Sequence, residues 1–153
     1  MAQPVPEGFH SVTPYLTVDD AAAAIDFYKR AFGAEEVMRL EMGDGIGHAE
    51  VKIGDSHLML SDEWPDHGKL GPKSRGGTST SMMLYVEDCD RAFRQAVDAG
   101  ATEVRPVEDQ FYGDRSGTLT DPFGHEWTIG THKEDLSTET IQRRMHEMMA
   151  AQA

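Results

Sequence analysis

Gly33-Ala34-Glu35-Glu36-Val37 recurs as Gly100-Ala101-Thr102-Glu103-Val104, an offset of 67 residues from position 33 to position 100. The residues before each stretch also correspond, because Val18-Asp19-Asp20 and Val86-Glu87-Asp88 both open an alanine-containing helical pattern at an offset of 68 residues. A repeat of this length that occurs twice cannot form a solenoid, which needs at least about three stacked units to bury a core. The chain is therefore predicted to contain two copies of one module in a pseudo-twofold arrangement.

Each copy is predicted to contain one helix and four strands in the order β-α-β-β-β. In the first copy Ile25, Tyr28 and Phe32 share one helical face, Asp19 or Asp20 caps the helix, and Gly33 follows its last turn. The first copy has predicted strands at 12–18, 36–41, 46–53 and 56–61 around a helix that ends at 32; the second has strands at 79–86, 103–107, 113–120 and 125–131 around a helix at 88–99. This order predicts an α+β fold.

The length of 153 residues fits one globular domain, 1–153. The first module spans about 10–62 and the second about 79–132; the stretch 62–78 is rich in Gly, Pro and charge, which is typical of a linker. Ser137 is the expected N-cap of a C-terminal helix at about 137–150, in which Ile141, Met145, Met148 and Met149 follow a helical spacing. This methionine-bearing face is expected to dock on the body of the protein or on a second subunit.

Composition argues against nucleic-acid and membrane partners. The chain carries 27 acidic against 14 basic side chains, a formal charge of −13, which repels phosphate backbones and anionic lipids. No apolar run approaches the roughly 20 residues of a membrane-spanning helix. The single cysteine, Cys89, cannot form an internal disulfide and is flanked by Asp88 and Asp90, which disfavour a reactive thiolate. Residues 1–8 lack the features of a signal peptide, so a cytoplasmic protein is expected.

Several motifs, in the right order, resemble the vicinal-oxygen-chelate superfamily, which contains glyoxalase I, extradiol dioxygenases and bleomycin-resistance proteins. They are Ile25-Asp26-Phe27-Tyr28, Phe32-Gly33-Ala34 and Asp121-Pro122-Phe123-Gly124-His125. Further motifs resemble the PhnB-like branch: His48-Ala49-Glu50, Ile53-Gly54-Asp55-Ser56, Leu84-Tyr85-Val86-Glu87-Asp88, Phe111-Tyr112-Gly113-Asp114-Arg115 and His125-Glu126-Trp127. The resemblance covers about residues 10–135. It implies one curved mixed sheet from each module, a cup-shaped cavity between the sheets, a small-molecule ligand and a homodimer.

Metal-using members of this superfamily carry four ligands on the first and last strands of the two modules. The resemblance puts these places at Thr13, Met59, Ser81 and Thr128, and none of them is His, Glu or Asp. Hydroxyl and thioether groups bind divalent metals weakly, so no metal cofactor is expected. An unorthodox metal site is the alternative, and it would draw on His10, His48, His57 and His125 with Glu50 and Glu126.

Hairpin geometry predicts which side chains share the cavity. A two-residue turn at Gly54-Asp55 pairs Glu50 with Met59 and His48 with Ser61, all on one face. A turn over 121–124 pairs Thr120 with His125, Gly117 with Thr128 and Arg115 with Gly130, which makes Arg115 the counterpart of His48. The predicted ligand-binding residues are Thr13, Tyr15, Met59, Ser81, Met83, Tyr85, Tyr112 and Thr128, and the charged residues among them are His48, Glu50 and Arg115.

The charged residues have more than one interpretation. His48 and Glu50 are candidates for a general base with its orienting carboxylate, and Arg115 is the third candidate catalytic residue. Alternatively, Glu50 and Arg115 form a structural ion pair, or Asp114 and Arg115 brace the loop after Tyr112. Two functions follow: a metal-free protein that binds a small organic molecule, or an enzyme of the lyase, isomerase or dioxygenase type that uses a metal or the trio His48, Glu50 and Arg115. The missing metal ligands favour the binding protein.

Overall fold

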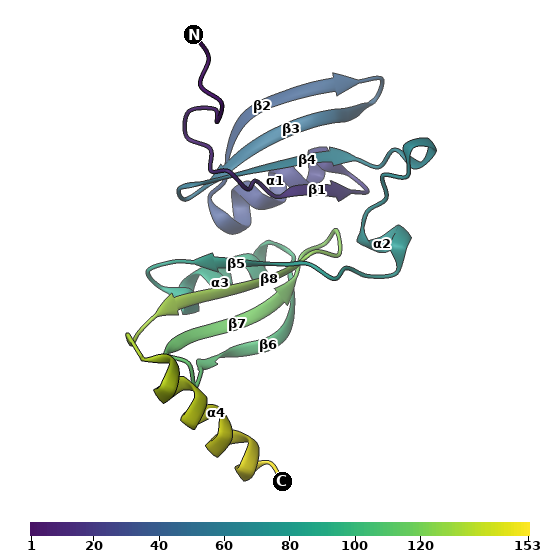
Figure 1. The fold of residues 1–153 in the computed structure, drawn as a ribbon. Helices are drawn as coiled ribbons and strands as arrows, with labels where there is room; N and C mark the ends of the chain where they lie inside the picture. Colours follow the sequence, from purple (N-terminus) through teal and green to yellow (C-terminus); the bar gives the residue numbers. More distant parts are fainter.

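A computed structural model describes residues 1–153 and confirms the α+β class with two modules. The elements are β1 (Tyr15–Val18), α1 (Ala21–Phe32), β2 (Glu35–Met42), β3 (Gly45–Ile53), β4 (Ser56–Asp62), η1 (Pro65–His67), α2 (Pro72–Arg75), β5 (Ser81–Tyr85), α3 (Cys89–Ala99), β6 (Thr102–Asp109), β7 (Asp114–Thr120), β8 (Glu126–His132) and α4 (Thr138–Ala151). Two four-stranded sheets have the equivalent orders β1-β4-β3-β2 and β5-β8-β7-β6 (Figure 1). In each sheet the first and last strands of the module, β1 with β4 and β5 with β8, pair in parallel. The other neighbouring strands pair antiparallel.

Local signals position the helices as the sequence predicts. Asp20 caps α1 by accepting a hydrogen bond from the Ala23 amide at 3.0 Å, and Gly33 ends the helix in the left-handed conformation at φ 67°. Asp88 caps α3 in the same way, through the Arg91 amide at 3.1 Å. The expected N-cap Ser137 is confirmed, because its Oγ accepts a hydrogen bond from the Thr140 amide at 3.1 Å.

One core joins the two modules. Tyr28 and Phe32 of α1 contact Trp127 of β8, with ring centroids 5.5 Å and 4.6 Å apart. Helix α1 therefore packs on its own sheet and also on the second module, and Figure 1 shows it on the side of its sheet that faces that module. The buried apolar side chains form a single cluster of 23 residues drawn from both modules. Each sheet consequently buries one side against its helix, and the other side of each sheet is called here the helix-free face.

The turn between β7 and β8 fastens the second module to the first. The buried Asp121 carboxylate accepts hydrogen bonds from Tyr28 Oη at 2.7 Å, Trp127 Nε1 at 2.9 Å and the backbone amides of Phe123 and His125 at 2.9 and 3.0 Å. His125 Nε2 donates to the Thr17 carbonyl of β1 at 3.1 Å. Burial, followed by the neighbouring Asp121 carboxylate, holds the pKa of Tyr28 well above its ordinary value, so its hydroxyl remains a donor. The Asp-Pro-Phe-Gly-His motif thus supports the contact between the modules.

The predicted register of the second hairpin is wrong by one residue. The Asp121 amide donates to the His125 carbonyl at 2.8 Å, and the two amide bonds to the Asp121 carboxylate hold His125 inside the turn. Thr120 therefore pairs with Glu126, Thr118 with Thr128, and Arg115 with Thr131. The first hairpin confirms the predicted pairing of Glu50 with Met59.

Some boundaries also differ. β1 begins at Tyr15 rather than at residue 12, because Pro14 has no amide hydrogen and contributes only its carbonyl, which accepts from the Met59 amide at 3.0 Å. The stretch predicted as a linker contains the short helices η1 and α2. At the other end, α4 projects away from the second module (Figure 1) and has no fully buried residue, although Ile141 and Met145 are half-buried; docking of its methionine face stays a prediction.

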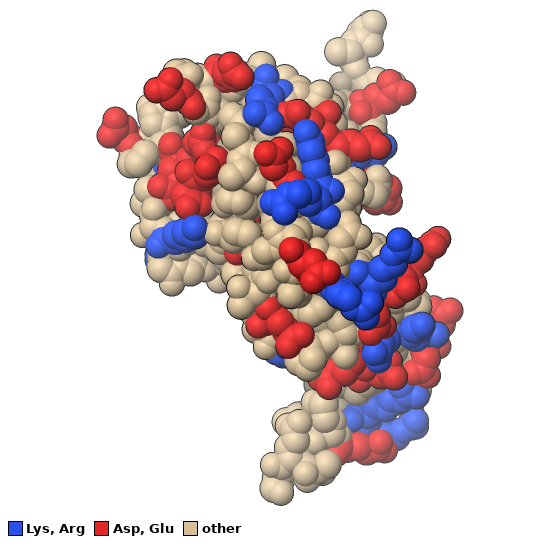
Figure 2. All heavy atoms as spheres, turned by 180° about the vertical axis from the view of Figure 1, so that it is seen from behind, with Lys and Arg blue, Asp and Glu red and all other residues tan.

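The surface is strongly acidic, as the composition predicts. Figure 2 shows Lys and Arg interspersed among Asp and Glu on one side of the molecule, with no continuous basic area there, and an uncharged tip at the end of α4. None of the helices combines the length and the hydropathy needed to cross a membrane.

Candidate functional site

The first helix-free face carries both polar and exposed apolar side chains. Tyr15, Met59 and Glu50 are consecutive partners across β1, β4 and β3, and Met38 on β2 continues the row. Because paired residues point to the same side of a sheet, all four lie opposite α1. Tyr15, Met38 and Leu40 remain 42%, 37% and 52% exposed. Such an apolar surface around titratable groups is typical of a binding surface.

Tyr15 and Glu50 form a hydrogen-bonded row with His48 of β3. Tyr15 Oη lies 2.9 Å from His48 Nδ1, and His48 Nε2 lies 3.1 Å from Glu50 Oε1. The row confirms the prediction that Tyr15, His48 and Glu50 share one face. Lys69 reaches over this face from the linker: its ammonium lies 4.3 Å from the centre of the Tyr15 ring and 3.3 Å from Ser61 Oγ.

The second helix-free face has a different set of polar contacts. Thr118 and Thr128 share a hydrogen bond of 3.1 Å, and Tyr112 Oη lies 3.5 Å from Ser116 Oγ. The buried Asp114 carboxylate accepts from Tyr85 Oη at 2.8 Å and from His132 Nδ1 at 2.7 Å. Sequence reasoning missed the role of Asp114 because the register error placed it on the opposite face. The hydrogen bond to Asp114, followed by burial, raises the pKa of Tyr85.

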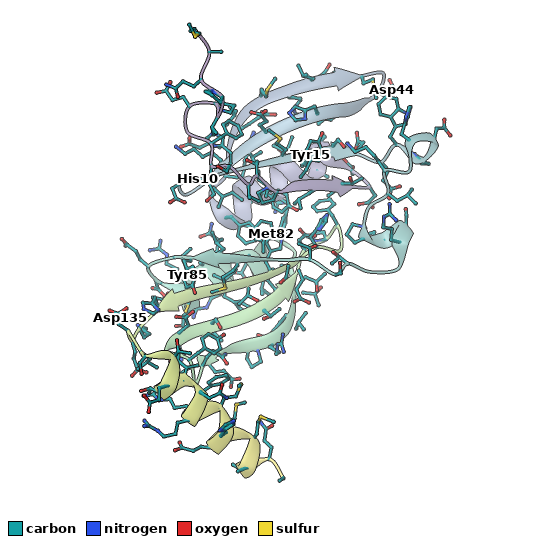
Figure 3. The ribbon with its side chains drawn as sticks, viewed as in Figure 1. His10, Tyr15, Asp44, Met82, Tyr85 and Asp135 are labelled. Atoms are coloured by element: carbon teal, nitrogen blue, oxygen red, sulfur yellow. The ribbon has the colours of Figure 1, made fainter.

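His132 joins this face to the segment that leads into α4. Its Nε2 lies 2.8 Å from Asp135 Oδ1, so both ring nitrogens face carboxylates, and Asp135 precedes α4 (Figure 3). The hydrogen bond to Asp114, with that to Asp135, raises the pKa of His132 above its ordinary value of 6.5. Only the imidazolium form of His132 donates from both ring nitrogens. Protonation of His132 therefore stabilises its two hydrogen bonds to Asp114 and Asp135, called here the His132 clamp.

We expect this clamp to make stability depend on pH. Because the folded-state pKa of His132 is raised, its contribution is fully present below the ordinary pKa of 6.5 and is lost as the pH rises through the raised value. The urea midpoint measured on either side of pH 6.5 should therefore fall more with rising pH in the natural protein than in His132→Gln. Equal pH dependence in the two proteins would contradict this role.

Arg115 does not join His48 and Glu50. With the corrected register it lies on the helix side of β7, where its guanidinium binds the Asp90 carboxylate of α3 through two bonds of 2.8 and 2.9 Å. Asp109 accepts a third bond at 3.2 Å. The Arg115 hydrogen bonds lower the pKa of Asp90. Neither the Glu50–Arg115 pair nor the Asp114–Arg115 pair is formed, and Arg115 instead fastens the start of α3 to its sheet.

Two cavities lie along the boundary between the modules. The larger, about 880 Å³, lies between the residues before β1, the β3–β4 turn and β5, and it includes the predicted ligand-binding residues Thr13, Ser81, Met83 and Tyr85. The smaller, about 630 Å³, lies between β1 and residues 75–80 and includes Tyr15. Figure 3 shows Tyr15 and Tyr85 on opposite sides of this boundary, with Met82 between them. Met59, Tyr112 and Thr128 line neither cavity.

The histidines of the alternative metal site lie apart. His57 stacks on Phe9 and bonds to the Gly8 carbonyl, His125 bonds to β1, and His48 bonds to Tyr15 and Glu50. No group of three or more His, Cys, Asp or Glu side chains in residues 1–153 has a geometry that could hold a metal ion.

The sequence shows the family of this protein, and the fold agrees with it. The chain belongs to the Glyoxalase/Bleomycin resistance protein/Dioxygenase superfamily, whose sequence profile matches residues 8–129. This membership confirms the resemblance inferred from the motifs.

Individual proteins are similar to this chain in sequence or in fold. An uncharacterised protein of Mycobacterium tuberculosis, Rv0887c, is 44% identical over 139 residues, which cover 88% of this chain and 82% of that protein. The crystallised product of the Arabidopsis thaliana gene At5g48480 is 28% identical with a TM-score of 0.64, covering 79% of this chain and 98% of that one. A PhnB protein of Bacillus cereus shares the fold at 18% identity and a TM-score of 0.63, covering 80% and 99% of the two chains.

Proposed function

We propose that this protein binds a small organic molecule against its helix-free sheet faces, without the divalent metal used by other members of the superfamily. The observation that carries the proposal is the first helix-free face, where the row Tyr15, His48 and Glu50 lies among exposed Tyr, Met and Leu side chains. A few oriented polar groups on an apolar surface are what small-molecule sites require.

A second copy of the chain completes the site in this proposal. No hydrogen bond, ion pair or ring contact joins the first helix-free face to Met83, Tyr85 or Thr128 on the second. Tyr85 is 58% exposed and Met83 42%, which leaves apolar surface on that face too. A homodimer that sets the first face of one protomer against the second face of its partner would cover both surfaces.

The side chains at the superfamily's metal positions do not fit a divalent ion. The predicted positions Thr13, Met59, Ser81 and Thr128 offer only hydroxyl and thioether donors. The register places Tyr15 beside Met59 and Met83 beside Thr128, which adds a phenol and a second thioether. These bind Zn²⁺, Ni²⁺, Mn²⁺ and Fe²⁺ weakly in comparison with imidazole and carboxylate.

An enzyme is the second candidate, and the Glu50–His48–Tyr15 row favours it. A carboxylate that orients an imidazole is the arrangement used for general acid–base catalysis. In an enzyme, His48 would be the general base, Glu50 would orient it, and Tyr15 would be hydrogen-bonded to it. Arg115 would have no catalytic role, because it binds Asp90 and Asp109.

The test is a thermal-shift screen of small aromatic and polar compounds with the natural protein and Glu50→Gln. We expect at least one compound to raise the Tm of the natural protein and to bind Glu50→Gln about tenfold more weakly, because the variant loses a charge-assisted hydrogen bond to His48. His57→Gln, on the same face but outside the row, is the control and should bind normally. A stoichiometric metal in protein purified without chelator, or a monomer by light scattering, would contradict the proposal.

A further inference from the structure

The cavity beside the linker is lined by a buried histidine that has an unused ring nitrogen. His125 lines this cavity of about 630 Å³ and is only 7% exposed. Its Nε2 lies 3.1 Å from the Thr17 carbonyl, whereas its Nδ1 is buried and has no hydrogen-bond partner. No other buried side-chain nitrogen or oxygen in residues 1–153 lacks a partner. Because an unsatisfied buried polar atom is unfavourable, Nδ1 indicates a group from outside the chain.

The hydrogen bond to Thr17 decides what Nδ1 can bind. A carbonyl oxygen only accepts, so Nε2 carries the hydrogen of the neutral imidazole and Nδ1 has a lone pair. A partner of Nδ1 must therefore donate a hydrogen bond. The turn fixes the ring in this place, because the His125 amide donates to Asp121 at 3.0 Å and α2 packs directly on Gly124. A Cβ atom on Gly124 would lie only 2.8 Å from Pro72 Cβ.

The cavity is lined by a fixed cation and by no carboxylate. Arg75 lines it, and no Asp or Glu does, although the chain has 27 acidic side chains and a formal charge of −13. The Arg75 guanidinium donates from Nε to the Leu70 carbonyl at 3.3 Å and from Nη2 to the Gly68 carbonyl at 2.8 Å. Its Nη1 has no acceptor, and Arg75 forms no ion pair. An anion in the cavity therefore meets a positioned donor that is free to bind it.

The rest of the lining suits an organic molecule. The backbone amides of Thr78 and Ser79 make no hydrogen bond within the chain and can donate to oxygen atoms. The volume lies within the roughly 300–1,000 Å³ that is typical of small-molecule sites. Apolar walls come from β1, the linker and β5, where Figure 3 labels Met82; they are Leu16, Leu70, Pro72 and Met82.

We propose that this cavity is a second ligand site and that it binds a small organic acid with a hydrogen-bond donor beside its carboxylate. The carboxylate pairs with Arg75, and an N–H or O–H group of the ligand donates to His125 Nδ1. An apolar part of the ligand packs on the aliphatic walls. No bond is made or broken in this step. Of the Glu50–His48–Tyr15 row, only Tyr15 lines this cavity, so the two sites can be tested separately.

The probe is N-acetyl-L-leucine, which has a carboxylate, an amide N–H and an apolar side chain. Two analogues each lack one of these groups. N-acetyl-L-leucinamide has no carboxylate, and in O-acetyl-L-leucic acid an ester oxygen replaces the N–H. Isothermal titration calorimetry at neutral pH measures the three affinities. We expect N-acetyl-L-leucine to bind the natural protein and each analogue to bind about tenfold more weakly, because each analogue loses one hydrogen bond to a positioned group.

Arg75→Gln removes the cation of the cavity, and Lys73→Gln is its matched control. Lys73 belongs to the same helix and carries the same charge, but it pairs with Asp19 and does not line the cavity. Arg75→Gln should bind N-acetyl-L-leucine about tenfold more weakly and the leucinamide unchanged, because only the acid needs the cation. Lys73→Gln should bind both compounds like the natural protein.

Nitrogen NMR of the natural protein follows His125 directly. The Nδ1 resonance should move to lower frequency when N-acetyl-L-leucine binds, because the nitrogen gains a hydrogen-bond donor. It should stay in place at saturating O-acetyl-L-leucic acid, which has no N–H to give. This measurement needs no substitution at His125, whose Nε2 bond to Thr17 joins the two modules.

Four results would overturn the inference. Equal affinities for the acid and the leucinamide would mean that no cation recognises the carboxylate. Equal losses in Arg75→Gln and Lys73→Gln, or loss of leucinamide binding in Arg75→Gln, would remove the assigned role of Arg75. Equal affinities for the amide and ester acids with a stationary Nδ1 resonance would exclude His125 as the acceptor. If N-acetyl-L-leucine does not bind, the ligand class is wrong, while the compound screen still tests the helix-free faces.

Discussion

Asp121→Ala is expected to lower the free energy of unfolding by about 4 kcal/mol. The variant would leave the buried donors of Tyr28, Trp127 and two backbone amides without their common acceptor. A single unsatisfied buried group costs about 1–3 kcal/mol, and partial rearrangement reduces the sum. Urea unfolding followed by Trp fluorescence and by circular dichroism measures the loss.

The first module supplies the control for Asp121→Ala. Asp55 occupies the equivalent turn between β3 and β4 but is exposed, and its carboxylate accepts a single side-chain hydrogen bond, from Ser56 at 3.0 Å. Asp55→Ala should therefore change stability by no more than about 0.5 kcal/mol. Similar losses in the two variants would mean that the turn, and not the buried carboxylate, holds the modules together.

Gly117→Val is expected to destabilise the protein by about 3 kcal/mol through overpacking. A Cβ atom at this position would lie 2.8 Å from Val107 Cγ2, 2.9 Å from Phe93 Cε2 and 3.0 Å from the Val107 amide nitrogen. Phe93 belongs to the buried face of α3, so little space can open without moving that helix. The unfolding midpoint in urea, with an unchanged slope, measures the effect.

Thr118→Val is the matched control on the other side of β7. It keeps the side-chain volume and loses only the hydrogen bond of 3.1 Å to Thr128, so we expect a cost of about 1 kcal/mol. If instead Gly117→Val were tolerated and Thr118→Val were severe, β7 would have the register predicted from the sequence.

Local signals were sufficient to predict the three longer helices, α1, α3 and α4, and the module order, but not the short helices η1 and α2. The aspartate caps, Gly33 and the apolar face with Ile25 and Tyr28 depend on residues a few positions apart, and the structure contains all of them. The register of the second hairpin depends instead on the Asp121 side chain, which folds back on two amides and enlarges the turn. Residue identity alone does not show that contact.

The part of the candidate site that lies on the first module could be predicted from the sequence. The pairing of Glu50 with Met59 follows from a two-residue turn, and it leads to the face that carries His48 and Tyr15. Arg115 was misplaced because one residue of slip reverses the side on which every later side chain points. Lys69 and the two cavities arise from how distant segments pack, which no pattern within one strand contains.

The shared core also has an evolutionary consequence. Trp127 of the second module packs against α1 of the first, so neither module can be replaced without changing this contact. Recombination that exchanged one half for that of a distant relative would have to bring matching aromatic surfaces with it. A substitution in the aromatic contact of one module therefore constrains which residues the other module can tolerate.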